Sequence, residues 1–452
     1  MTGFFLLVAV LAGSGAPVDA HSRPSPAVAS PVASALASTG ASAAAPPAAP
    51  APAPPQPPEK SPEQRRTLAA VESLWVAGRT DSCWAILGSE LRTARSRGDS
   101  AFVLDLLTLR GRARARIGLI QEAEPDLRAA IALAEVLGQP RTLRANLRWL
   151  SYTFDRQGRN AEALGGWRRL LTLSQASGDS LHEAWARTGI GFLAWQKGDA
   201  REAAAEYRRA LDLFDGIHDA RDEAFVHNGL GTVLQAQGRY AQAEAQYLEA
   251  ADGAHASGWT WLEALAFNNI ASLRFSLGDP GQARDLYTKS AELHRRAGDL
   301  AEAAFTGQNI ALCDQALGLF EEAIAGLQRI RDDCRAHGIV QLDGYFCNAL
   351  AETRFAQGRL RAAAALFREN LGRGDASPPT TRRDSVLGLA RVLARVDSLE
   401  AALALLDRQS ALFGTGDPLD MVEYRLALGQ ALQQAGRPAE ALPELIATER
   451  EA

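Results

Sequence analysis

The 452-residue sequence predicts an all-α fold, a solenoid of antiparallel helix pairs in tandem. Two series of glycines mark a repeat of 40 residues. The stretches between the glycines carry apolar residues at helical spacing, without the alternation that is typical of strands. A chain of this length exceeds one compact core, and a repeat array grows without needing a larger one. These observations favour stacked helix pairs over separate globular domains.

The glycines indicate where each helix ends. Glycine takes the left-handed conformation that ends a helix without a Cβ clash, so two stops per repeat predict helices of about 15 to 18 residues. The first series is Gly78, Gly118, Gly158, Gly198, Gly238, Gly278, Gly318 and Gly358, then Ser398 in the next slot and Gly436 two residues early. The second series is Gly98, Gly138, Gly178, Gly258, Gly298 and Gly338, with His218 as the one gap.

The composition of residues 1–60 indicates two segments that precede the predicted repeat array. The apolar run at 4–13 and the small residues ending at Ala20 are typical of a signal peptide over 1–20, although no Lys or Arg precedes the run. We expect a periplasmic or secreted protein, with a cytosolic location as the alternative. Residues 21–60 are almost wholly Ala, Pro and Ser, which predicts a disordered linker. Composition rich in Ala, Gly, Pro and Arg suggests a bacterial source.

Residues 61–452 predict the repeat array itself. Order begins at Ser61, where the sequence SPEQ offers an N-cap Ser, a Pro at the first helical position and a Gln at the third. Asp99, Asp179 and Asp299 follow their glycines and are expected to cap the next helix. A large residue nine positions after each first-series glycine is expected to fill the space between repeats. These residues are Leu127, Trp167, Tyr207, Tyr247, Tyr287, Leu327 and Phe367.

Residues 228–251, NGLGTVLQAQGRYAQAEAQYLEAA, resemble a tetratricopeptide repeat, with Leu-Gly, a later Gly, Ala, Tyr and Ala in the family's order. Residues 268–291 and 188–211 resemble it closely too, and the 40-residue period is similar to that of kinesin light chains. The resemblance covers residues 64–450, nine to ten repeats, and departs from the pattern around Arg391 and Ser398. It implies a right-handed superhelix whose first helices line an inner groove that binds a protein or peptide.

The family register assigns three sets of residues to the groove. Four amides at 40-residue spacing, which donate and accept to peptide units, are Asn228, Asn268, Gln308 and Asn348. Aromatic contacts for anchor side chains are Trp185, Phe192, Trp195, Phe225, Phe275, Phe305, Tyr345 and Phe355. A basic end for an acidic partner segment is formed by Arg112, Arg116, Arg148 and Arg156.

Each set has a structural alternative. Amides on a helix face are also solvated or serve as caps between repeats. Aromatic residues at helical spacing also belong to the core, and Trp185 and Trp195 fit either description. The arginines also fit a solvated face, although residues 91–170 contain 15 Arg against 8 acidic residues.

No motif indicates catalysis or a cofactor. The sequence LHEAWAR at 181–187 lacks the second His of a zinc helix, and Gly229 and Gly231 lie mid-helix without a preceding strand. We expect no metal site. The four cysteines show no metal spacing, and we favour free buried thiols over a disulfide between Cys334 and Cys347. A net charge of −5 argues against nucleic acid as the partner, and the apolar run at 4–13 is too short to span a membrane.

We therefore expect a non-enzymatic binding scaffold. The alternative is the sensory or regulatory half of a larger signalling system or of a caspase-like (CHAT-type) protease, because similar arrays precede such effector domains. Leu442, Leu445 and Ile446 have no following helix to cover them, which predicts an uncapped C-terminal end that takes a further domain, a partner or a second copy of the chain.

Overall fold

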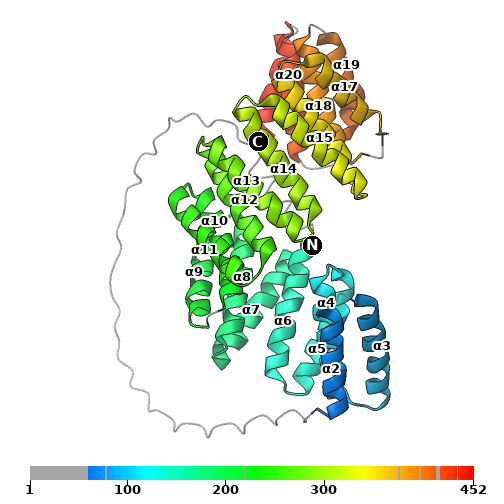
Figure 1. The fold of residues 1–452 in the computed structure, drawn as a ribbon, viewed down its shortest axis with the longest axis vertical. Coiled ribbons are helices and arrows are strands. Elements are labelled where there is room, and N and C mark those ends of the chain that lie inside the picture. The colour runs from blue at the N-terminus through cyan, green and yellow to red at the C-terminus, as the bar shows by residue number, and fades with distance from the viewer. Residues whose placement is uncertain are drawn as a thin grey trace, which may run out of the picture. The chain divides into compact units, whose positions relative to one another are not determined.

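The computed structural model describes residues 60–76, 79–217, 219–374, 377–396, 399–413, 418–434 and 436–451, and these contain helices and no strand. Gly78, His218 and Ser398, like the expected signal peptide and linker, lie outside the described residues. The helices fall into two compact units that divide after Lys197 (Figure 1). We call these unit 1 and unit 2.

Unit 1 begins with the expected cap. The Gln64 backbone N–H donates to Ser61 Oγ over 3.1 Å, and the Ser61 N–H donates to Gln64 Oε1 over 2.8 Å, a reciprocal pair that fixes the first turn. The helices of this unit are α2 (Pro62–Val76), α3 (Thr80–Ser96), α4 (Ser100–Arg116), α5 (Ile120–Val136), α6 (Pro140–Arg156), α7 (Asn160–Ser177) and α8 (Ser180–Gln196).

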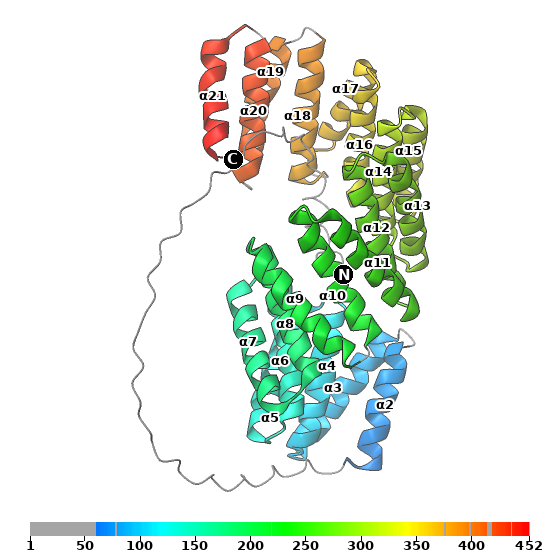
Figure 2. The same ribbon diagram turned by 90° about the vertical axis from the view of Figure 1, so that its left-hand side faces the viewer.

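Unit 2 continues the same arrangement, and α18, α20 and α21 stand side by side near its C-terminal end (Figure 2). The helices are α9 (Ala200–Asp215), α10 (Ala220–Ala236), α11 (Tyr240–Ala256), α12 (Thr260–Ser276), α13 (Pro280–Arg296), α14 (Leu300–Ala316), α15 (Phe320–Ala336), α16 (Asp343–Ala356), α17 (Leu360–Leu371), α18 (Pro379–Arg395), α19 (Leu399–Gln409), α20 (Pro418–Gln434) and α21 (Pro438–Glu451), with short 3₁₀ turns η1 (Val340–Leu342) and η3 (Ser410–Leu412).

The helix ends confirm the glycine prediction. Gly118 has φ = 85°, and the next N–H, that of Leu119, reaches back to the Arg114 carbonyl over 2.9 Å. This left-handed stop satisfies carbonyls that the helix leaves open. All described glycines of both series have positive φ. The carboxylates of Asp99, Asp179 and Asp299 cap α4, α8 and α14 as expected.

Several of the large side chains between helices lie against a glycine. All seven predicted residues, from Leu127 to Phe367, are buried. A Cβ at Gly189 would lie 2.3 Å from the Trp167 ring, and one at Gly388 would lie 2.3 Å from the Phe367 ring. The first helix of one repeat therefore approaches the second helix of the preceding repeat closely. Within each unit the chain is a solenoid of consecutive antiparallel helix pairs.

The register changes between α15 and α18. The 3₁₀ turn η1 replaces the first turn of α16, and α17 ends after 12 residues. Pro378 and Pro379 then begin α18, because proline suits the first turn of a helix. All four cysteines are free and buried, which confirms the prediction of thiols over a disulfide.

Candidate functional site

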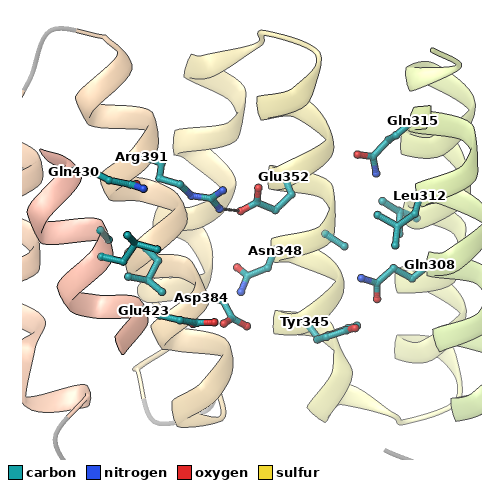
Figure 3. A pocket seen from close by; sticks show the side chains of 15 residues that line it. Gln308, Leu312, Gln315, Tyr345, Asn348, Glu352, Asp384, Arg391, Glu423 and Gln430 are labelled. Atoms are coloured by element: carbon teal, nitrogen blue, oxygen red, sulfur yellow. Dashed lines mark hydrogen bonds and ion pairs between the residues drawn. The ribbon is translucent and has the colours of Figure 1, made fainter. Parts of the chain in front are cut away.

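Unit 2 contains a cavity of about 500 Å³, which we call the α14–α20 cavity. Its walls come from the first helices of four successive pairs, α14, α16, α18 and α20, and α15 adds Leu327 (Figure 3). The lining residues are Gln308, Leu312, Gln315, Leu327, Tyr345, Asn348, Ala349, Glu352, Asp384, Leu387, Arg391, Glu423, Leu426, Ala427 and Gln430.

Helical spacing brings these side chains to one wall. On α14 the lining residues are four and three positions apart, at Gln308, Leu312 and Gln315. The lining residues of α16, α18 and α20 repeat this spacing. Residues three, four and seven apart lie on one helix face, so each first helix contributes one stripe to the cavity.

Part of the lining is exposed apolar surface. Leu312 on α14 and Leu426 on α20 are each 40% exposed, although both are large aliphatic residues. Leu387 on α18 is half-buried beside them, whereas Leu327 is fully buried. Exposed apolar groups gathered in one concavity are typical of a binding site rather than of a solvated face.

An aromatic and amide pair forms the α14–α16 side of the cavity. The Tyr345 ring packs edge-on against Phe305 with centroids 5.2 Å apart. Burial raises the pKa of the Tyr345 phenol, a hydrogen bond from Gln308 lowers it, and the charge of Asp384 raises it again. Gln308 Oε1 is buried and has no hydrogen-bond partner among the described residues.

An ion pair crosses the cavity wall between α16 and α18. Arg391 Nη2 lies 2.5 Å from Glu352 Oε1. Burial raises the pKa of the Glu352 carboxyl, and the charge of Arg391 acts against that rise. The Arg391 guanidinium also lies 5.6 Å from the Phe355 ring centroid. Both side chains of the pair are partly exposed, so the pair forms a polar edge of the cavity.

Asn348 reaches the cavity wall, but its amide is bound inside the protein. Its Nδ2 donates to the Thr381 carbonyl over 2.8 Å, and its Oδ1 accepts from Asn370 Nδ2 over 3.0 Å and from Ser385 Oγ over 2.7 Å. These bonds occupy the donor and acceptor atoms of the amide, so few hydrogen-bonding sites remain for a peptide. We assign Asn348 the capping role between repeats that was the structural alternative.

The four amides do not form one continuous stack of equivalent groups. Asn228 on α10 is buried, and its Oδ1 accepts from Asn269 Nδ2 over 2.9 Å. Asn268 on α12 is half-buried and, like Asn228, is not part of the α14–α20 cavity. Of the predicted residues, the cavity brings together Gln308, Tyr345 and Asn348.

The remaining predicted aromatics lie elsewhere on the first helices. Phe225 stacks on Trp259 with centroids 6.3 Å apart, and Phe275 is 37% exposed. Phe192 and Trp195 are half-buried on α8 in unit 1. On the same helix, the Trp185 ring lies 3.6 Å from the guanidinium carbon of Arg148.

The four arginines of the expected basic end lie on α4 and α6 of unit 1. Arg112, Arg148 and Arg156 are half-buried and Arg116 is exposed. Arg148 stacks on an aromatic ring, as a guanidinium does in a packed wall. An acidic partner at these residues stays a prediction. Leu442 and Ile446 on α21 are exposed, and self-association there likewise stays a prediction.

The 40-residue repeat spacing does not predict the lining residues of α18 and α20. Asp384, Arg391 and Glu423 follow the shift between α15 and α18, so the 40-residue register no longer indicates which face they take. Spacing counted within each helix, from Asp384 to Leu387 to Arg391, would have found them.

Two other classes of site find no support in the described part of the chain. No group of three or more His, Cys, Asp and Glu side chains there could hold a metal ion. No described helix combines the length and the apolar character that crossing a lipid bilayer requires.

Comparisons with known proteins agree with this fold. A tetratricopeptide repeat family profile matches residues 190–256 and 222–296. None of the curated protein sequences matches the chain. Among solved structures, the apo form of RapI is 12% identical with a TM-score of 0.58, and 77% of this chain covers 98% of it. The apo quorum sensor NprR from B. thuringiensis is 15% identical with a TM-score of 0.55, with 86% of this chain covering 98% of it.

A third structure is longer than this chain. A signal transduction ATPase with a tetratricopeptide repeat sensor, from Pyrococcus horikoshii, is 14% identical with a TM-score of 0.53. This chain covers 52% of it, about half its length. The fold and the cavity define an α-solenoid with a lined inner face. Residues 190–296 match the tetratricopeptide repeat family, and the fold of the chain is similar to that of these solved structures.

Proposed function

We propose that this chain is a non-enzymatic scaffold that binds a protein or peptide segment in the α14–α20 cavity. The observation that carries the proposal is the cavity itself, which four successive first helices line and in which exposed Leu312 and Leu426 lie beside polar groups. A segment laid across these helices would bury Leu312 and Leu426, which water now contacts.

Affinity capture with the full chain tests the proposal. The double variant Leu312→Glu/Leu426→Glu places two charges in the cavity, and we expect it to lose its bound partners by at least about tenfold, because a buried charge opposes binding. Leu248→Glu on α11 is the matched control, since Leu248 is 46% exposed and lies outside the cavity. An unchanged partner set on the double variant would contradict the proposal.

A second candidate function is the sensory module of a larger system. It draws on the fold likeness to the quorum sensor NprR and to the sensor-bearing ATPase, of which this chain covers about half. The same cavity would then receive the signal. A caspase-like effector has no support in these comparisons, so the binding scaffold remains the first proposal.

A further inference from the structure

The first helices of unit 1 carry aromatic side chains at the repeat positions that line the α14–α20 cavity in unit 2. Phe192 on α8 lies three repeats before the cavity residue Leu312 in the 40-residue series. Trp195 has the same relation to the cavity residue Gln315, and Tyr152 on α6 lies one repeat before Phe192. All three aromatic side chains are half-buried, so part of each ring reaches the surface. We call Tyr152, Phe192 and Trp195 the aromatic face of unit 1.

Helix packing brings the three rings to one surface. Helices α6 and α8 are in contact, and equivalent positions of adjacent repeats lie side by side in a repeat array. Phe192 and Trp195 are three positions apart on α8, so they share one side of that helix. The Trp149 ring packs edge-on against Tyr152 with centroids 5.7 Å apart and so supports the Tyr152 ring. The aromatic face therefore offers ring surface from two adjacent helices.

The chain enters unit 1 beside the same row of repeat positions. Lys60 is the first described residue, and its Nζ lies 3.2 Å from Asp105 Oδ2 on α4. Asp105 lies six repeats before Tyr345, another residue that lines the α14–α20 cavity. Gln64 Nε2 donates to Asp99 Oδ2 over 2.7 Å, so the start of α2 is bound to the start of α4. The segment before Lys60 is therefore joined to the array next to the inner positions of α4.

That segment is rich in proline. Residues 46–58, PPAAPAPAPPQPP, contain eight prolines and no charged residue. Proline fixes φ at about −65° and has no N–H, so such a sequence favours polyproline II and offers carbonyl oxygens with few donors. Sequences of this kind bind on aromatic side chains. The rings of the aromatic face supply apolar contact area, and the Tyr152 hydroxyl and the Trp195 indole N–H are donors for carbonyl oxygens.

The aromatic face is within reach of residues 46–58. Helix α6 contacts both α4 and α8. The axes of packed helices are about 8–10 Å apart, so α8 lies about 20 Å from α4. A polyproline II chain rises about 3.1 Å per residue, so a segment as long as residues 46–58 spans about 40 Å. Such a segment can cross α6 and α8 while Lys60 stays beside α4.

We propose that residues 46–58 of this chain dock on the aromatic face of unit 1, with their prolines against the aromatic rings. This contact lies in unit 1 and does not depend on binding in the α14–α20 cavity. The docked segment would cross the helices that also carry Arg112 and Arg148. A partner that binds this side of unit 1 would have to displace the segment, so the contact is autoinhibitory for that surface.

Photo-crosslinking within the full chain tests this docking. A benzophenone side chain placed at Ala53, in the middle of the segment, should form intrachain crosslinks that mass spectrometry locates on α6 and α8. Trp195→Ala should lower the yield of these crosslinks at least about threefold, because the docked segment loses aromatic contact. Phe275→Ala is the matched control and should leave the yield unchanged. Phe275 lies two repeats after Trp195, on α12 of unit 2, and is 37% exposed.

Variants of the segment itself leave the residues of the helices unchanged. Pro54→Ala/Pro55→Ala/Pro57→Ala should lower the yield by a similar factor, whereas Pro24→Ala/Pro26→Ala, upstream of the segment, should not. This comparison decides the outcome even if Trp195→Ala fails to fold. Crosslinks located mainly on unit 2, crosslinks between two chains that disappear on dilution, or a yield that the three-proline variant leaves unchanged would overturn the proposal.

Discussion

Asp155 on α6 is a carboxyl group whose ionisation the fold of unit 1 opposes. Burial raises its pKa to about 7, and a hydrogen bond from Trp167 Nε1 to Oδ2 over 2.8 Å acts against the rise. Its other oxygen, Oδ1, is buried without a partner among the described residues. In the unfolded chain the pKa of an aspartate carboxyl is about 3.9. The folded protein therefore holds a proton there that the unfolded chain has already lost.

This difference predicts a stability that falls with rising pH. Between about pH 4 and pH 7 the folded state binds more protons at Asp155 than the unfolded state does, so the free energy of unfolding decreases as pH rises through that window. The side-chain amide of the Asp155→Asn variant does not titrate in this pH range. Hydrogen exchange of α6 and α7 measures their local free energy of unfolding at pH 5 and at pH 8. We expect the decrease in this free energy from pH 5 to pH 8 to be smaller by about 1–3 kcal/mol in the variant than in the natural sequence. An identical pH dependence would show that Asp155 ionises freely.

At the scale of elements, a buried polar network joins α16, α17 and α18 where the register changes. Asn348, Asn370 and Ser385 bond one another, and Ser377 Oγ donates to Asn370 Oδ1 over 3.0 Å. All four side chains are buried. A Cβ at Gly344 would lie 2.6 Å from Asn370 Oδ1, so the backbone of α16 approaches the network closely. The network holds the walls of the cavity at a fixed separation.

Breaking this network should loosen the cavity walls. Asn348→Ala removes the two hydrogen bonds that Asn348 Oδ1 accepts from Asn370 and Ser385, and each lost bond costs about 0.5–1.5 kcal/mol. We expect faster hydrogen exchange of the backbone amides in α16 to α18. Hydrogen exchange measures the stability of these helices separately, which is needed because a chain of two units need not unfold in a single step. Gln308→Ala is the matched control, since it removes an amide at the equivalent repeat position that bonds Tyr345 and is not part of this network. Equal effects of the two variants would contradict a structural role for Asn348.

The sequence predicts the elements better than it predicts the site. Positive φ at glycines such as Gly118 follows from chain chemistry alone, so helix ends could be assigned residue by residue. Whether an amide faces solvent depends on its neighbours. Asn348 and Gln308 occupy equivalent positions of the repeat. The Asn348 amide forms hydrogen bonds to residues of α17 and α18, whereas Gln308 Oε1 has no hydrogen-bond partner among the described residues. Repeat spacing contains no information on that difference.

At the scale of the whole chain, the proposed binding site lies where the repeats differ. Large residues pack against glycines in the regular repeats, as Trp167 does against Gly189, and also in the α16 to α18 segment, where Phe367 packs against Gly388. The α16 to α18 segment adds a buried polar network and the cavity-lining residue Asp384. A repeat array grows by neighbour contacts alone, so one altered repeat can form a binding site without changing the others.

The most direct test of a ligand in the α14–α20 cavity is site-specific photo-crosslinking. A benzophenone side chain placed at Leu312 should crosslink a partner that the full chain captures, because a bound segment covers this exposed residue. The same group at Leu248 on α11 should crosslink none. Crosslinks of equal yield at both positions, or crosslinks confined to a benzophenone at Trp185 in unit 1, would contradict the account.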